Sequence, residues 1–184
     1  MKKIIITAFL LIGIFSTYAQ QSTFNKGDKV INASIGLGSV MYSGFGYSTS
    51  VPPISGSFEL GFKDDFLVDK ATLGFGAYMG FSKNKWESYG WGWTYTNIIL
   101  GARAALHYPV LDNFDTYGGI MLGFNIVSSK EFGINSGIIT NSAGSGIAYS
   151  FYVGGRYYFT KNIALLGELG YGIAWLNVGL SFKL

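Results

Sequence analysis

Apolar residues alternate with small or polar residues along most of the chain after residue 29. A spacing of two places successive side chains on opposite faces of a β-strand, whereas an amphipathic helix needs a period near 3.6. No window beyond the N-terminal segment sustains that helical period. The alternation therefore predicts eight strands, at residues 31–37, 54–62, 73–81, 96–108, 120–126, 147–159, 163–171 and 176–184.

The opposite face of each segment indicates what surrounds the sheet. It carries glycine, serine and asparagine with few charges, as at Asn32, Ser57 and Gly101. A soluble eight-stranded barrel would instead turn a heavily charged face to water. Small residues suit a narrow lumen and large apolar residues suit lipid, where a sheet satisfies its backbone by closing on itself. The pattern predicts an all-β fold, an eight-stranded antiparallel up-and-down transmembrane β-barrel.

The lengths of the connections predict the orientation of this barrel. Residues 39–53, 82–93 and 128–146 form long connections, residues 109–113 and 160–162 form short ones, and the others are moderate or tight. Long loops face outward and short turns face the periplasm in such barrels, so both termini are expected on the periplasmic side. Aromatic residues gather at both expected rims, as interfacial girdles do. They are Tyr42, Tyr47, Trp86, Trp91, Trp93, Tyr95 and Trp175 at the outer rim, and Phe62, Tyr108, Phe114, Tyr157, Phe159 and Phe182 at the inner one.

The N-terminal residues predict a segment that directs export and is then removed. Basic residues at 2–3, an apolar run at 4–15 and small residues at 17–19 are typical of a secretory signal peptide. We therefore expect a signal peptide at 1–19, an N-terminal lead-in at 20–28 and a barrel domain at 29–184. Cleavage would change the balance from 13 basic and 10 acidic residues to 11 and 10, so the basic pI of the whole chain does not indicate a nucleic-acid partner.

The overall residue content agrees with a lipid-facing barrel. Hydrophobic residues make up 49% of the chain and charged residues 12%, about half the usual fraction for a soluble domain. The chain has no cysteine, which excludes a disulfide framework, a thiolate nucleophile and a cysteine zinc site.

Four stretches of the chain resemble a known family. They are KGDKVINASIGLGS at 26–39, PPISGSFELGF at 52–62, TYGGIMLGFNIVSS at 116–129 and GELGYGIAWLNVGLSFKL at 167–184. Together with the N-terminal pattern they are similar to the outer membrane protein β-barrel domain family, the small OmpA/OmpX-type eight-stranded barrels of Gram-negative bacteria. The resemblance covers nearly the whole mature chain and implies a barrel inserted by the outer-membrane assembly machinery. It implies architecture rather than activity, and the terminal Leu184 departs from the aromatic residue with which the family usually ends.

Four charged side chains fall near the middle of strands on the lumen side: Glu59, Arg103, Arg156 and Glu168. Buried charges must pair, because an isolated buried charge costs several kcal/mol. We expect them to form an ion cluster that fills the lumen and fixes the register of the strands. The alternative is a salt-bridge gate in a narrow pore for ions or small solutes.

His107 is the single histidine and the candidate base for catalysis. Some eight-stranded outer-membrane barrels modify lipids and need a Ser/His pair near the outer leaflet. His107 falls instead beside Pro109 and a short periplasmic turn, which favours a rim residue. Asp64, Asp65 and Asp69 lack the spacing of a calcium-binding loop, so a solvated turn is expected. We expect no catalytic residue, no metal and no cofactor.

The connection at 82–93 carries the candidate surface contacts Trp86, Tyr89, Trp91 and Trp93. Such aromatic residues suit stacking on sugars or on a protein partner, and they equally suit an aromatic belt among headgroups and lipopolysaccharide. We favour the aromatic belt.

The sequence as a whole favours a structural or surface-interaction role, in envelope integrity or adhesion, without catalysis. The alternatives are the narrow pore and, more distantly, an outer-membrane lipid-modifying enzyme. The expected location is the outer membrane of a Gram-negative bacterium, as a monomer. The expected partners are outer-membrane lipid and lipopolysaccharide, with the assembly machinery and periplasmic chaperones during biogenesis and no nucleic acid; any extracellular ligand stays unidentified.

Overall fold

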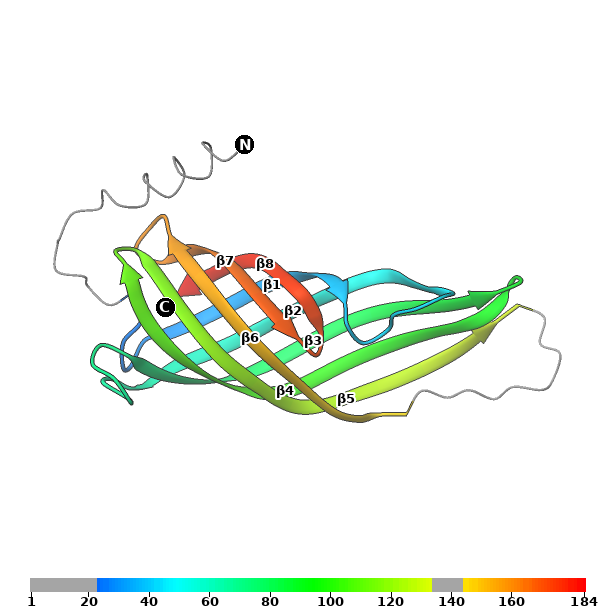
Figure 1. Cartoon of the computed structure of the whole chain (residues 1–184), viewed down its shortest axis with the longest axis horizontal. Coiled ribbons are helices and arrows are strands. Elements are labelled where there is room, and N and C mark those ends of the chain that lie inside the picture. Colours follow the sequence, from blue (N-terminus) through cyan, green and yellow to red (C-terminus); the bar gives the residue numbers. More distant parts are fainter. Residues whose placement is uncertain (1–22, 134–143) are drawn as a thin grey trace, which may run out of the picture.

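The regular structure of this chain is a closed antiparallel barrel (Figure 1). A computed structural model describes residues 23–133 and 144–184, so the expected signal peptide lies outside the described residues, as does much of the expected connection at 128–146. Each strand pairs with the next, and β8 pairs with β1 to close the sheet. The strands are β1 (Lys29–Ser39), β2 (Tyr47–Lys63), β3 (Thr72–Ser88), β4 (Trp91–Leu111), β5 (Phe114–Phe132), β6 (Gly146–Tyr158), β7 (Ile163–Tyr171) and β8 (Ala174–Lys183). The predicted fold is confirmed.

Alternation along each strand separates an apolar outer wall from a polar lumen. On β1, Ile31 and Ile35 are 42% and 47% exposed, whereas the intervening Asn32 is 3% exposed. On β5, Leu122 is 62% exposed and its neighbour Met121 is buried. Apolar side chains on the outside and polar ones inside reverse the order of a soluble barrel and match a wall that faces lipid. Among the described residues, no helix is long and apolar enough to cross a membrane.

Side chains fill the lumen between the walls. Buried residues from β4 to β7 pack into one apolar cluster, which includes Ile99, Tyr117, Met121, Tyr152 and Leu166. Eight strands enclose little more than the side chains that fill the interior. The lumen is therefore a packed core and leaves little free space.

The strands differ strongly in length, which gives the barrel one high side. β2 to β5 have 17 to 21 residues, whereas β6, β7, β8 and β1 have 9 to 13. Figure 1 shows β3, β4 and β5 continuing far past the end of β7 and β8. We call the end where β3 meets β4 the outer end, and the end near residue 23 the inner end.

The long connection expected at 82–93 is wrong. β3 continues to Ser88 and β4 begins at Trp91, so Tyr89 and Gly90 form a two-residue turn, both with positive φ. That conformation is typical of the tight hairpin turns that match strand twist. Side chains still alternate between two faces through 82–88. One face now carries charged residues, and the other carries serine, asparagine and tryptophan, so the apolar pattern ends before the strand does.

The long connection expected at 39–53 is also shorter in the structure. β2 begins at Tyr47, although Pro52 and Pro53 lie within the strand. Proline is tolerated where a strand edge needs no amide donor. The pairing of β1 with β2 ends at Ile35 and Ile54, so both prolines lie on an edge that β1 no longer covers.

The described part of the lead-in folds into the inner end of the barrel. Gly27 donates its amide to the carbonyl of Gly61 at 2.8 Å, and the Lys183 ammonium lies 2.6 Å from Asp28. Phe24 is 1% exposed and its ring stacks on His107 at 4.0 Å between centroids. Residues 23–28 thus close the inner mouth.

Candidate functional site

Six charged side chains from five strands meet in the lumen. Each is 6% exposed or less, and each occupies an inward position of its strand. They are Glu59 on β2, Arg103 and His107 on β4, Asp115 on β5, Arg156 on β6 and Glu168 on β7. We call this set the lumen network.

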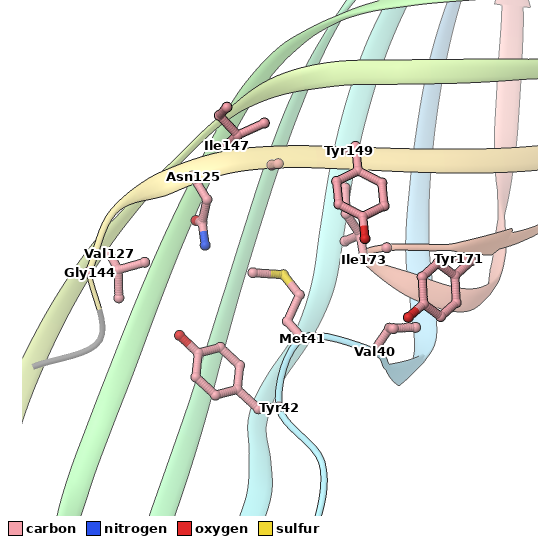
Figure 2. Close-up of a pocket in the computed structure, with 12 residues that line it drawn as sticks. Val40, Met41, Tyr42, Asn125, Val127, Gly144, Ile147, Tyr149, Tyr171 and Ile173 are labelled. Atoms are coloured by element: carbon pink, nitrogen blue, oxygen red, sulfur yellow. The ribbon is translucent and has the colours of Figure 1, made fainter. Parts of the chain in front are cut away.

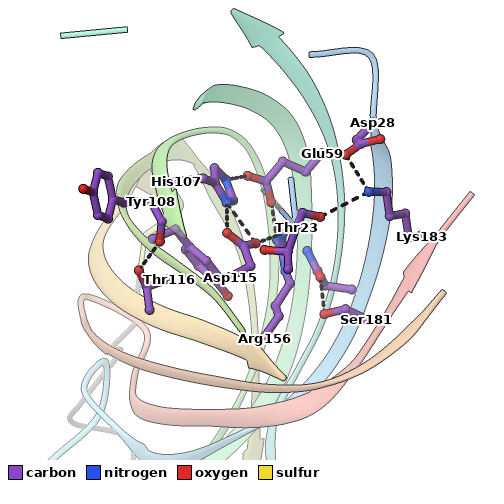
Figure 3. Close-up of polar contacts among 12 residues, drawn as sticks. Thr23, Asp28, Glu59, His107, Tyr108, Asp115, Thr116, Arg156, Ser181 and Lys183 are labelled. Carbon is purple, nitrogen blue, oxygen red and sulfur yellow. Dashed lines mark hydrogen bonds and ion pairs between the residues drawn. The ribbon is translucent and has the colours of Figure 1, made fainter. Parts of the chain in front are cut away.

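The inner half of the network is a ring of four groups (Figure 3). His107 Nδ1 lies 2.9 Å from Asp115 Oδ1, and His107 Nε2 lies 2.5 Å from Glu59 Oε1. Arg156 joins the same two carboxylates, with Nη1 donating to Asp115 at 3.1 Å and Nη2 donating to Glu59. With both carboxylates ionised, each can only accept hydrogen bonds, so both ring nitrogens donate and the histidine is assigned as the imidazolium.

The outer half of the network pairs Arg103 with Glu168. Arg103 Nη2 donates to Glu168 Oε1 at 2.6 Å, and the Tyr117 hydroxyl donates to the same oxygen at 2.9 Å. Arg103 Nε donates to the Tyr152 hydroxyl at 3.0 Å, and Nη1 reaches Ser57 Oγ at 3.3 Å. The remaining donors of the guanidinium are thus directed to hydroxyls, which a buried ion pair requires if it is to offset its desolvation.

The network is electrically neutral. Two arginines and one imidazolium face three carboxylates, and all six groups take part in ion pairs. Removing one member would leave an uncompensated charge in a site that water hardly reaches, which is strongly destabilising. The arrangement can hold the strands in register and block the lumen.

The structure brings together the four charges that the sequence predicted and adds two more. Glu59, Arg103, Arg156 and Glu168 all lie in the lumen, where Arg103 pairs with Glu168 and Arg156 pairs with Glu59. The two added residues complete the ring, because His107 pairs with Glu59 and Asp115, and Asp115 also pairs with Arg156. The rim position expected for His107 is wrong, because the residue is 1% exposed beneath Phe24. The alternation along β4 could have placed His107 correctly, because it is an even number of residues from Arg103 and therefore faces the lumen as Arg103 does.

His107 has the wrong surroundings for a catalytic base. Both ring nitrogens contact carboxylates, and the ring faces Phe24 and Tyr117. A base that activates a hydroxyl needs a free nitrogen within hydrogen-bond distance of it. The geometry is that of a structural cation.

Two of the three acidic residues of the β2–β3 connection, Asp64 and Asp65, bind the chain itself. Asp64 Oδ1 accepts hydrogen bonds from the Lys26 amide at 2.7 Å and from Thr72 Oγ1 at 2.9 Å. Asp65 Oδ1 accepts from the Lys70 amide at 2.8 Å. Within residues 23–133 and 144–184, no group of three or more histidine, cysteine or acidic side chains is arranged to hold a metal ion.

Aromatic and amide side chains cover the outer mouth of the lumen. Tyr42, from the β1–β2 connection, stacks on Tyr95 at 5.1 Å and lies 5.8 Å from Tyr47. Its hydroxyl donates to Asn97 Oδ1 at 3.1 Å, and Asn125 Nδ2 donates to the same oxygen at 3.0 Å. Burial raises the pKa of the Tyr42 phenol, so this hydroxyl stays protonated and keeps donating at physiological pH.

The extended hairpin carries the tryptophans on the same side. Trp86 pairs with Trp93 across β3 and β4, and two residues nearer the barrel Asn84 pairs with Tyr95. Because alternate residues share a face, these side chains continue the inward face of the lumen. The lipid-facing outer girdle is therefore wrong for Tyr95, which is 2% exposed, and for the other expected members that face inward beside it, which are Tyr42, Tyr47, Trp86 and Trp93. We call the inward set at this end the mouth face: Tyr42, Tyr47, Asn84, Trp86, Trp93, Tyr95, Asn97 and Asn125.

The other two candidate contact residues of the hairpin differ from each other. Trp91 packs edge-on against Trp86 at 5.6 Å, and its Nε1 donates to Glu131 Oε1 at 2.8 Å. Tyr89 stands at the turn with its side chain fully exposed. The four aromatic residues of the predicted contact set thus differ in their surroundings, because Tyr89 is fully exposed at the turn whereas Trp86 and Trp91 pack against each other.

A cavity of about 340 Å³ borders the mouth face (Figure 2). Asn125 and Tyr42 line one side of it, and Met41, Ile173 and Tyr149 are among the residues that complete its wall. The cavity lies where the high wall of β5 passes the low wall of β6 and β7. None of the described residues that line it is charged.

Comparisons with known proteins support the fold. No protein-family model and no curated protein sequence matches the chain. The outer membrane protein OprG from Pseudomonas aeruginosa is similar over 89% of this chain and 99% of its own, with a TM-score of 0.52 and 10% identity. The N-terminal β-barrel domain of Pseudomonas aeruginosa OprF is similar over 88% of this chain and 100% of its own, with a TM-score of 0.45 and 16% identity. Yersinia pestis Ail in a phospholipid nanodisc is similar over 86% of this chain and 100% of its own, with a TM-score of 0.48 and 13% identity.

The OprG match is the one of these three above a TM-score of 0.5, so the comparison depends on it and concerns the fold alone. This chain has the fold of the small eight-stranded outer-membrane barrels. The resemblance noted from the sequence is confirmed at that level.

Proposed function

We propose that the protein is an integral outer-membrane barrel of a Gram-negative bacterium that acts as a sealed scaffold for interactions at the cell surface. The observation that carries the proposal is the contrast between the two ends of the lumen. A neutral network of six buried charges blocks the inner half, whereas β2 to β5 continue past the other end and present an aromatic face. A blocked lumen argues against transport, and a raised wall provides a surface for contacts.

The outer wall supports placement in a membrane. Large apolar side chains point away from the barrel all around the sheet, for example Phe58 at 40%, Leu100 at 48% and Phe151 at 58% exposure. Soluble monomers rarely expose contiguous apolar patches of this extent. Lipid and, in the outer leaflet, lipopolysaccharide are the partners that such a wall accepts, and a wall occupied by lipid suits a monomer.

Biogenesis follows from the same proposal. The N-terminal pattern at 1–19 would direct export and be cleaved, periplasmic chaperones would keep the apolar strands apart, and the outer-membrane assembly machinery would insert them. The role is structural or interactive, in envelope integrity or adhesion. Catalysis is not part of the proposal, because His107 is held between two carboxylates.

Conductance across planar lipid bilayers tests the proposal against the narrow pore. The purified, folded protein should insert without producing current steps, because Arg156 and Arg103 lie across the lumen with their partners. Glu59→Gln and Arg156→Gln variants provide the comparison, with Lys85→Gln on the hairpin as the control outside the lumen. Reproducible ohmic steps from the unmodified protein, changed by either lumen variant and unchanged by the control, would show that the lumen conducts.

A further inference from the structure

Buried hydrogen-bonding atoms without a partner gather in the mouth face and directly beneath it. Among the described residues, five of the nine buried side-chain atoms that lack a partner within the protein lie there. They are Ser82 Oγ, Asn84 Nδ2, Trp93 Nε1, Asn97 Nδ2 and Asn125 Oδ1. Asn84 and Asn97 are 1% and 0% exposed. Buried polar groups are nearly always paired, because an unsatisfied one costs about 1–3 kcal/mol, so this concentration requires an explanation.

The chemistry of these atoms is that of a site for hydroxyl groups. The free atoms of Asn84, Asn97 and Trp93 are N–H donors, the free atom of Asn125 is an acceptor, and the Ser82 hydroxyl is both. Asn97 Oδ1 accepts from the Tyr42 hydroxyl and from Asn125 Nδ2, so Asn97 links the two polar side chains at the edge of this region. Amide and hydroxyl groups together present donors and acceptors side by side, which suits a ligand that offers both at each group, as a polyol does.

Aromatic rings beside these atoms supply the apolar half of such a site. Trp86 and Trp93 are cross-strand neighbours, and the rings of Tyr42, Tyr47 and Tyr95 lie within 6.5 Å of one another. Aromatic faces with a hydrogen-bonding edge bury large area while keeping polar contacts. Rings next to amides match a molecule with an apolar C–H face and a rim of hydroxyls.

The charge of the face decides between classes of ligand. The described inward positions of β3, β4 and β5 beyond Asn97 include a single charged residue, Glu131, and its carboxylate already accepts from Trp91. The lysines of the hairpin, Lys83 and Lys85, have the opposite parity. An ionic ligand buried here would lack a counter-ion, which is costly. The face therefore suits an uncharged ligand.

We propose that the mouth face and the adjoining cavity bind a neutral saccharide. Tyr42 and Asn125, which line the cavity, would contact its hydroxyl groups, Asn97 behind them would hold both side chains in place, and the tryptophans would lie against its ring faces. The cavity of about 340 Å³ shares Tyr42 and Asn125 with the face, and this volume lies at the lower end of the range for ligand sites. The inference rests on the proposed surface role and names the chemistry of its partner.

The test uses the full folded barrel in lipid nanodiscs on a printed glycan array. The array carries neutral hexose and N-acetylhexosamine oligosaccharides beside sialylated and sulfated ones. Retention is expected on neutral glycans, followed by a change in tryptophan emission when the best-retained neutral oligosaccharide is titrated. Asn97→Leu, which releases Tyr42 and Asn125, and Trp86→Ala, which removes a ring face, should each weaken binding about tenfold or more, equivalent to about 1.4 kcal/mol or more.

Tyr157→Ala is the matched control, because Tyr157 lies on β6 at the inner end, away from the mouth face and the cavity, and is 53% exposed. It should bind as the unmodified protein does, and a heat-dependent gel shift checks that every variant is folded. The inference is wrong if the folded protein retains no neutral glycan, if it retains charged glycans alone, or if Asn97→Leu and Trp86→Ala bind normally. It is also wrong if an apolar dye such as N-phenylnaphthylamine fills the cavity and no neutral glycan displaces it.

The two proposals fail separately. Membrane fractionation and bilayer conductance do not depend on a glycan. An outer-membrane, non-conducting protein that retains no glycan would overturn the saccharide site and leave the scaffold role standing. A soluble or conducting protein would overturn the scaffold role itself.

Discussion

At the level of single residues, His107 decides whether the lumen is neutral. Without its positive charge, Asp115 and Glu59 would face Arg156 alone, and the lumen would hold one excess negative charge. Phe24 covers the imidazole on the inner side, so solvent cannot easily screen that charge. The histidine therefore acts as a fixed cation that links β2, β4 and β5.

This account predicts a specific pattern of stability. His107→Gln should lower the free energy of unfolding by about 3 kcal/mol, because it leaves a buried carboxylate without its cation. The double variant His107→Gln with Asp115→Asn restores neutrality and should be more stable than the single variant. Urea unfolding in lipid vesicles, followed by tryptophan emission, measures both. A loss below about 1 kcal/mol for the single variant, or a double variant no better than it, would show that charge balance is not what His107 provides.

Most residues of the lumen network could be predicted from the sequence, because the alternation along each strand shows which side chains face inward. Glu59, Arg103, Arg156 and Glu168 follow from reading which face each strand turns inward. His107 has the same parity, but its depth depends on the segment at 23–28 that folds over it, and alternation carries no information about that segment. Asp115 lies beyond a register shift near Pro109, so its partner could not be inferred by counting along the hairpin.

At the level of elements, the unequal height of the wall separates the lipid-embedded barrel from its extension. Within the membrane, an apolar residue at every second position reveals a strand. Beyond it, the outward residues of β3 become Lys83, Lys85 and Glu87, because water rather than lipid lies outside. The same strand thus loses its apolar signal while it keeps its hydrogen bonds, which is why the sequence suggested a loop.

Hydrogen exchange distinguishes a strand from a loop directly. In the barrel reconstituted in nanodiscs, the amides of 82–88 and 91–97 should exchange as slowly as those of 98–104, because cross-strand hydrogen bonds protect all three segments. Residues 40–46, which join β1 to β2, provide the fast-exchanging comparison. Exchange at 82–88 as fast as at 40–46 would mean that the hairpin does not extend past the barrel.

At the level of the whole molecule, the fold could be predicted because two environments constrain every strand at once. Lipid selects residues such as Leu122 and Phe151 for the outside, and the narrow lumen selects glycine, serine and asparagine for the inside. Eight repeats of that pattern leave few arrangements besides a closed barrel. Alternation does not encode how high each strand rises, so the raised side and the mouth face required the structure.

The central claim is a membrane-spanning barrel that raises the β3–β4 hairpin outside the cell, and impermeant labelling tests it most directly. The chain has no cysteine, so Tyr89→Cys at the hairpin turn and Asp112→Cys at the opposite turn each supply one thiol. In intact Gram-negative cells, a membrane-impermeant maleimide should label Tyr89→Cys at once and Asp112→Cys after the outer membrane is permeabilised. Labelling of Asp112→Cys alone in intact cells, or equal labelling of both variants there, would contradict the account.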